Sequence, residues 1–411
     1  MTPLKLVLAF VGRRPLTWGF HVLTLALGVA VLTAVLALNA GLSGRFQRDL
    51  SGIDLVVGAK GSPLQLIMSS VFELDQPTGN IPLSTLATLQ GNMMVRRAVP
   101  VSQGDNVQGF RIVGTSTQFG SLYDAQLAQG TWWTQPMQAV VGSEAQKRLG
   151  FKVGQVFVGD HGLAPGGEAH RDSPYKVVGV LKRTGAAIDR LVLTDTASVW
   201  QVHHHEEVEH AEALAAGKPI DPADVDKSPS GREITAILVS YRSAMGALML
   251  PRYVTSMPNL QAASPAVETA HLTTLLGTGA DVLRSFGIGL LVLSALGFFT
   301  ALFSAVSERR QELALIRALG GSPALLFRLV TLEGLALGLG GGIAGVVLGR
   351  LAAAFAAHAA QAGVGPCLPL PALGSTELII VVGAAVLSLF AAMAPGLVAF
   401  RTNPAAVLRG A

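Results

Sequence analysis

The sequence predicts an α-helical membrane protein with four transmembrane helices and a large mixed α/β extracytoplasmic domain inserted between helices 1 and 2. Half of the 411 residues are hydrophobic and only 14% are charged, and the mean hydropathy is +0.49. Four long stretches are almost free of charged residues, and a polar section separates the first from the other three. This composition is typical of a membrane protein with a sizeable polar portion.

The first span is predicted at residues 16–43, because no Asp, Glu, Lys or Arg occurs from Leu16 to Gly44. That stretch reaches the ~20 residues that a bilayer-spanning helix needs. Residues 1–15 mix basic and apolar side chains and predict an amphipathic helix at the cytoplasmic membrane surface. The alternative is a cleaved signal peptide, but the apolar core of such a peptide is typically only ~7 to 15 residues long. We expect an uncleaved anchor.

Three further spans follow after the polar section, and the basic residues orient all four. Basic residues precede the first span, lie between the second and third, and follow the fourth. The positive-inside rule therefore predicts that both termini are cytoplasmic and that the polar section is periplasmic. The predicted segments after the first span are a periplasmic domain at 44–281, spans at 282–307, 323–360 and 378–400, a cytoplasmic helix at 308–322, a periplasmic loop at 361–377 and a cytoplasmic tail at 401–411.

The third span contains two rows of glycines at four-residue spacing. Small residues at this spacing let helix backbones approach closely in lipid. We expect both rows to pack tightly against neighbouring helices, either within one protomer or across a dimer. The two rows are Gly334, Gly338 and Gly342, and Gly341, Gly345 and Gly349.

The polar section predicts short strands and helices. Residues 153–159, 175–181 and 139–142 are β-branched runs interrupted or ended by glycine, which is a strand signal. Residues 84–90 and 143–149 have the composition of short helices. A mixed α/β domain is therefore expected.

A short charged segment lies between the second and third spans. Its charged residues surround an apolar stripe that includes Leu313, Ile316 and Leu319. Gly320 and Gly321 predict a left-handed C-terminal turn, and Ser322-Pro323 predicts the start of the next helix. On physical grounds alone, the segment is either a docking surface or an ordinary loop helix.

The motif Glu-Arg-Arg-x-Glu-x-x-x-x-Arg-Ala-x-Gly, from Glu308 to Gly320, resembles the coupling helix of MacB/FtsX-like ABC transporter permeases. This family is the mechanotransmission type, with LolC/LolE-like architecture. The order of short sequence motifs from residue 130 to residue 200 is similar to that in the family's periplasmic core domain. Residues 399–409 resemble the family's short cytoplasmic tail. By this resemblance, the residues that couple to an ATPase are Glu308, Arg309, Arg310, Glu312, Leu313, Ile316, Arg317, Leu319 and Gly320.

The resemblance implies a permease subunit in the bacterial inner membrane that couples ATP hydrolysis by a cytoplasmic ABC ATPase to work in the periplasm. It also implies a homodimer or a pairing with a paralogous permease, contact with membrane lipid, and candidate partners such as a periplasmic adaptor or a substrate-binding protein. ATP-Mg would act through the partner ATPase. The alternative is an FtsX-like regulator that activates a periplasmic hydrolase.

Several functions are disfavoured by what the sequence lacks. A net charge of +4, spread along the chain, does not favour a nucleic-acid partner. Cys367 is the only cysteine, so a thiolate metal cluster cannot form. Gly217-Lys218 is followed by Pro219, and no phosphate-binding loop occurs. We therefore expect the chain not to be an enzyme, with ATPase activity on a separate partner subunit.

A histidine-rich insertion is predicted at 201–232, and it raises a third hypothesis, a zinc-linked transport component. On a helix, His203, Glu207 and His210 would lie on one face, where imidazole and carboxylate groups can bind one cation. The alternative is a solvated loop. His161 and His170 flank a glycine pair and are interpreted as an exposed hairpin tip. The candidate zinc ligands are His203, His204, His205, Glu207 and His210.

Overall fold

The computed structural model describes residues 15–163, 166–203, 232–308, 310–360 and 370–401. The chain divides into two compact units. One, which we call the helical unit, comprises Met1–Ser43 and Leu275–Ala411; the other, the α/β unit, comprises Gly44–Thr274. The predicted fold class is confirmed, since the described residues contain four candidate membrane spans and a mixed α/β domain.

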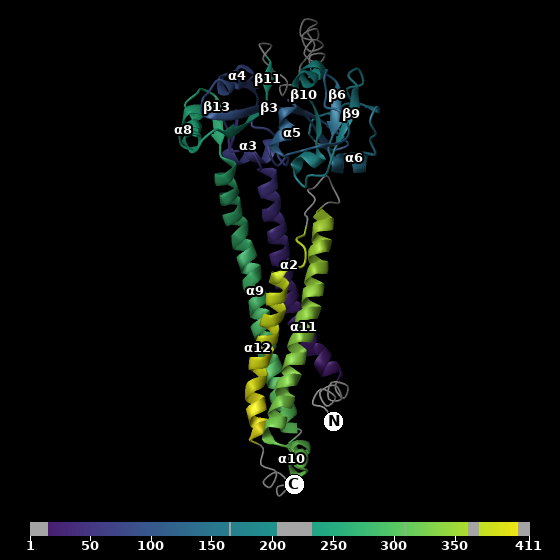
Figure 1. Cartoon of the computed structure of the whole chain (residues 1–411), viewed down its shortest axis with the longest axis vertical. Coiled ribbons are helices and arrows are strands. Elements are labelled where there is room, and N and C mark those ends of the chain that lie inside the picture. Colours follow the sequence, from purple (N-terminus) through teal and green to yellow (C-terminus); the bar gives the residue numbers. More distant parts are fainter. Residues whose placement is uncertain (1–14, 164–165, 204–231, 309, 361–369, 402–411) are drawn as a thin grey trace, which may run out of the picture. The chain divides into compact units, whose positions relative to one another are not determined.

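Within the described part of the chain, four helices are long and apolar enough to cross a membrane. Figure 1 shows them running alongside one another, and a short helix lies at the end where the chain passes from the second to the third. They are α2 (Pro15–Asp49), α9 (Pro265–Glu308), α11 (Pro323–Ala360) and α12 (Ser375–Phe400), and the short one is α10 (Arg310–Ala318). The candidate zinc ligands His204, His205, Glu207 and His210 lie outside the described residues.

The two glycine rows of α11 face two different helices of the same chain. A Cβ atom added at Gly338 would lie 2.7 Å from the backbone of Ala385 in α12. One added at Gly345 would lie 2.5 Å from Cβ of Val29 and 2.7 Å from the carbonyl oxygen of Ala26, both in α2. Separations below 3.0 Å essentially never occur for real Cβ atoms. The helices therefore approach this closely only because the glycines lack a side chain.

The α/β unit is built on one large sheet. Its strand order is β13-β1-β12-β3-β4-β10-β6-β9-β5, with β7 also paired to β9 and β8 to β3, while β11 and β2 form a separate pair. The strands are β1 (Leu55–Ala59), β2 (Ile81–Pro82), β3 (Val95–Val107), β4 (Phe110–Thr115), β5 (Leu127–Gly130), β6 (Gln138–Val141), β7 (Val156–Phe157), β8 (Asp160–His161), β9 (Tyr175–Leu181), β10 (Val192–Asp195), β11 (Glu233–Ile234), β12 (Ala236–Tyr241) and β13 (Leu260–Ala263).

Short helices pack around the sheet. The sequence patterns predicted the bounds of several of these helices and strands correctly. Two helices have the predicted bounds, and the second ends at Gly150, whose φ of +70° is the left-handed conformation that favours glycine. Strand β9 coincides with the run at 175–181, whereas only Val156–Phe157 of the run at 153–159 is a strand. The helices are α3 (Pro63–Ser70), α4 (Ser84–Gln90), α5 (Gln118–Leu122), α6 (Ser143–Leu149) and α8 (Ala244–Thr255), with a 3-10 turn at Ala187–Arg190.

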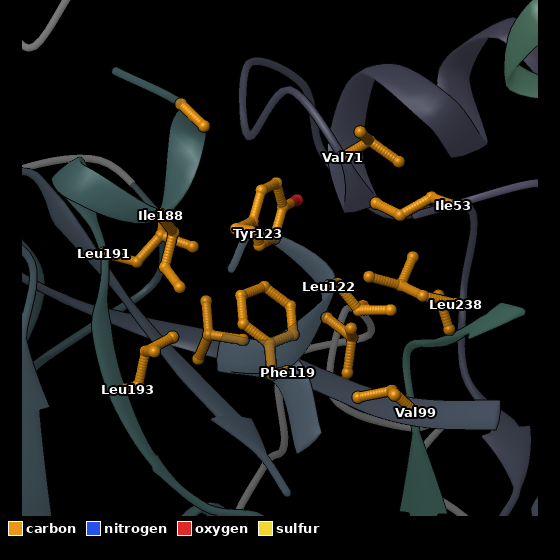
Figure 2. Packing of buried hydrophobic residues seen from close by; sticks show 14 of the residues in the cluster. Ile53, Val71, Val99, Phe119, Leu122, Tyr123, Ile188, Leu191, Leu193 and Leu238 are labelled. Atoms are coloured by element: carbon orange, nitrogen blue, oxygen red, sulfur yellow. The ribbon is translucent and has the colours of Figure 1, made fainter. Parts of the chain in front are cut away.

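The largest apolar cluster of the α/β unit forms around α5. Figure 2 shows Phe119 and Tyr123 packed among aliphatic side chains from strands and helices that are far apart in the sequence. Their ring centres are 5.5 Å apart, and both rings are buried. The sheet carries the core because strands β3, β4, β10 and β12 all contribute to this cluster.

Candidate functional site

The loop helix α10 ends in a well-defined turn. Gly320 has a φ of +96°, and the amide of Gly321 donates to the carbonyl oxygen of Ile316 at 2.9 Å. This is the hydrogen bond of a Schellman motif, in which a left-handed residue closes the helix. The hydroxyl of Ser322 then accepts from the amide of Leu325 at 3.2 Å, which caps α11. Very few residues therefore separate α10 from α11.

The two faces of α10 differ. Leu313 and Ala314 are buried, and Leu313 packs with apolar side chains of α9, α11 and α12. On the outer face, Leu315 is 52% exposed and Leu319 is 88% exposed. Because these two leucines are four residues apart, they are neighbours on the helix surface. The helix is therefore anchored by one apolar face and presents a second one outward.

The predicted coupling residues divide between these faces. Glu308 and Glu312 are exposed, Ile316 and Arg317 are half-buried, and Leu313 faces inward. Arg309 lies outside the described residues. Leu315 was absent from the predicted set, although its four-residue spacing from Leu319 was a signal that could have revealed it.

A second candidate site lies in the α/β unit, where distant segments bring three histidines to one carboxylate. Asp105 in β3 is paired with His161 in β8. Its Oδ1 lies 3.2 Å from Nε2 of His170, 3.4 Å from Nε2 of His203 and 3.9 Å from Nδ1 of His161. His203 belongs to the helical residues that follow β10. We call these four residues the His3Asp cluster.

The environment of Asp105 keeps its carboxylate charged. The side chain is 1% exposed, and burial alone would raise its pKa. Hydrogen bonds and the charges of His170 and His203 outweigh that cost and lower the pKa of Asp105 to about 2. The histidines range from nearly buried to half-exposed, with side-chain exposures of 9% for His170, 25% for His203 and 44% for His161.

This geometry corrects the interpretation of His170 as part of an exposed hairpin tip, whereas His161 is exposed as expected. Both rings contact Asp105, and His170 is almost buried. Of the predicted zinc ligands, only His203 lies within the described residues, and its ring contacts residues that the sequence analysis did not select. Asp105 was missed because its neighbours in β3 include no histidine or second carboxylate, and the histidines around it come from distant segments.

Comparison with known families matches two long stretches of the chain. Residues 19–243 match the model of the MacB-like periplasmic core domain, and residues 284–404 match that of the FtsX-like permease C-terminal domain. The chain belongs to the MacB/FtsX-like ABC permease family. The permease is a membrane protein, as the four apolar helices among its described residues indicate.

Individual relatives of the permease are distant. It is 23% identical over 345 residues to the pyoverdine export ATP-binding/permease protein PvdT of Pseudomonas putida, a match that covers 79% of this chain and 48% of PvdT. It is 31% identical over 84 residues to the ABC transporter permease YtrF of Bacillus subtilis, covering 19% of each chain. The permease therefore spans about half the length of the PvdT proteins that it matches.

Among solved structures, the periplasmic region of MacB from Actinobacillus actinomycetemcomitans aligns with 55% of this chain and 95% of its own length. The sequence identity is 12% and the TM-score is 0.34.

Proposed function

We propose that this permease couples ATP hydrolysis by a cytoplasmic ABC ATPase to work performed by the α/β unit on the periplasmic side of the inner membrane. The observation that carries the proposal is the outer face of α10, where an apolar pair remains exposed beside charged residues. Family membership supports it, and PvdT combines ATP-binding and permease functions in its name. The ATPase would be a separate subunit.

The two faces of α10 suit a docking element. Burial of Leu313 at 4% exposure fixes the helix to the spans. Leu315 and Leu319 then supply the apolar contact for a groove on the ATPase, since fully burying a leucine contributes roughly 1.5 to 3 kcal/mol. Glu312 and Arg317 would form ion pairs around this contact, which fix its orientation more than its strength.

The orientation follows from the same docking. Partner ATPases consume cytoplasmic ATP, so α10, both termini and the tail would be cytoplasmic. The basic residues flanking the spans support this arrangement by the positive-inside rule. Two permease chains, identical or paralogous, would bind two ATPase subunits, and a periplasmic adaptor or substrate-binding protein would meet the α/β unit.

The test is to purify the tagged chain in mild detergent and to identify stoichiometric partners by mass spectrometry. We expect an ATPase with the wild type and its loss with Leu315→Asp/Leu319→Asp, which places two charges in the apolar contact. Met93→Asp is the matched control, because Met93 is 87% exposed in the α/β unit. If the double variant retained the ATPase at full stoichiometry, the assignment of Leu315 and Leu319 to the docking face would be wrong.

The same experiment separates the transporter from the regulator. A periplasmic hydrolase that co-purifies with the ATPase would favour an FtsX-like activator. Absence of any ATPase from the wild-type complex across several detergents would contradict both versions.

A further inference from the structure

The His3Asp cluster has the symmetry of a ligand shell. The ring centres of the three histidines lie 5.5, 5.6 and 5.7 Å apart, close to an equilateral triangle. Each pair of rings is nearly perpendicular, with interplanar angles of 78°, 81° and 82°. All three rings converge on one carboxylate oxygen of Asp105. Hydrogen bonding to one oxygen does not require such regular spacing of three rings.

Two of the three contacts to Asp105, those of His170 and His203, have the spacing of ligands in tetrahedral zinc coordination, and the contact of His161 is longer. Zinc binds imidazole nitrogen and carboxylate oxygen at about 2.0 to 2.2 Å, so two ligand atoms of a tetrahedron lie roughly 3.3 to 3.6 Å apart. The three contacts to Oδ1 of Asp105 span 3.2 to 3.9 Å. Imidazole centres around such an ion would be roughly 5 Å apart, slightly less than the separations in the cluster.

A second observation is independent of these spacings. Oδ2 of Asp105 is buried and has no hydrogen-bond partner among the described residues. A buried acceptor without a partner costs about 1 to 3 kcal/mol, and a cation bound by both oxygens of the carboxylate would remove that cost. The ligand atoms of Asp105, His161 and His203 all lie within 4.8 Å of one another.

The cluster also has a route to solvent. His161 is its most exposed member, and it lines a hollow of about 570 Å³ together with Asp75 and Arg111. An ion could therefore enter beside His161, while His170 and Asp105 hold it from the protein interior. This differs from a wholly buried site, into which an ion could pass only if the sheet opened.

We propose that Asp105, His161, His170 and His203 form a zinc site in the α/β unit. Three neutral imidazoles and one carboxylate are ligands that zinc prefers, and they balance one of its two charges. The site uses a different ligand set from the histidine run after His203. It does not depend on the docking of an ATPase to α10, so failure of either proposal leaves the other standing.

The test is zinc content of the full-length chain in detergent, measured by mass spectrometry after loading with zinc chloride and extensive dialysis. We expect about one zinc per chain in the wild type and loss of most of it in His161→Ala and in Asp105→Asn. His161→Ala removes the most exposed ligand, and Asp105→Asn keeps the shape of the side chain. His271→Ala is the matched control, since His271 is exposed and outside the cluster.

A second chain variant separates the two histidine sets. His204→Ala/His205→Ala/His210→Ala leaves the cluster intact and should retain zinc. Retention by His161→Ala together with loss by the triple variant would overturn the proposal, as would a wild type that holds no zinc.

A stability measurement excludes misfolding as the cause of lost zinc. Because bound metal stabilises the folded state by mass action, zinc should raise the unfolding temperature of the wild type and of His271→Ala. His161→Ala should unfold at the temperature of the metal-free wild type and show no response to zinc. An equal zinc response in His161→Ala would contradict the assignment.

Discussion

The helical unit and the α/β unit are stabilised in opposite ways. In the helical unit, α11 approaches α2 and α12 through glycines, where an added Cβ atom would collide with a neighbouring helix. In the α/β unit, bulky side chains such as Phe119 and Tyr123 fill the space around the sheet. The helical unit therefore depends on positions that lack a side chain, and the α/β unit depends on large buried side chains. Adding atoms should harm the first, and removing them should harm the second.

The largest effect is expected from truncation in the α/β unit. Phe119→Ala removes a ring that is 1% exposed and in contact with Tyr123, and should lower the free energy of unfolding by about 3 to 5 kcal/mol. Thermal unfolding of the full chain followed by tryptophan fluorescence measures it, since Trp132, Trp133 and Trp200 belong to this unit. Met93→Ala, at an exposed site, should unfold like the wild type. Equal stability of the two variants would show that the buried Phe119 ring does not stabilise the α/β unit.

A smaller effect is expected from addition in the helical unit. Gly345→Ala places a methyl group 2.5 Å from Cβ of Val29 and should destabilise the packing of α2 on α11 by roughly 2 to 3 kcal/mol. Size-exclusion chromatography after heating in detergent should show that this variant aggregates at a lower temperature than the wild type. Gly340→Ala on the same helix is the control, because nothing lies within 4 Å of its added Cβ. Similar behaviour of both variants would mean that close approach is not what holds these helices.

The α/β unit also buries an ionisable carboxyl group, Glu73. Burial raises the pKa of Glu73 to about 7, although Arg111 and Gln103 contact its carboxylate at 3.4 and 2.6 Å. The folded state thus binds a proton more tightly than the unfolded state, whose carboxyl has an ordinary pKa. Stability from Glu73 is therefore complete below about pH 4.5 and is lost as the pH rises through about 7, by roughly 2 kcal/mol between pH 5 and 8.

Glu73→Gln checks this assignment because the amide cannot ionise. Thermal unfolding of wild type and variant is compared across that range, and the slope attributable to Glu73 should disappear in the variant. An unchanged slope would show that another group causes it.

The sequence predicted the helical unit far better than the site in the α/β unit. A span, a glycine row and a helix-ending Gly-Gly pair are local patterns, readable within one helix. The His3Asp cluster depends on pairing between β3 and β8 and on the return of the chain at His203. Asp105 and His203 are far apart in sequence, so only the fold of the sheet brings them together. The run of adjacent histidines predicted His204, His205, Glu207 and His210 as partners of His203, and these four residues lie outside the described part of the chain.

The glycine rows of α11 have a consequence for how the helices find their alignment. Identical residues at identical intervals look the same after a shift of four residues, or about 6 Å along the axis. Such a row permits close approach but holds no information about position along the helix. That information must come from unique contacts at the ends, such as the Arg350 guanidinium, which lies 3.5 Å from Glu377 and donates to the carbonyl oxygen of Pro371 at 2.7 Å. The glycine rows thus allow α11 to slide along its neighbours, and the contacts of Arg350 fix its position along the helix axis.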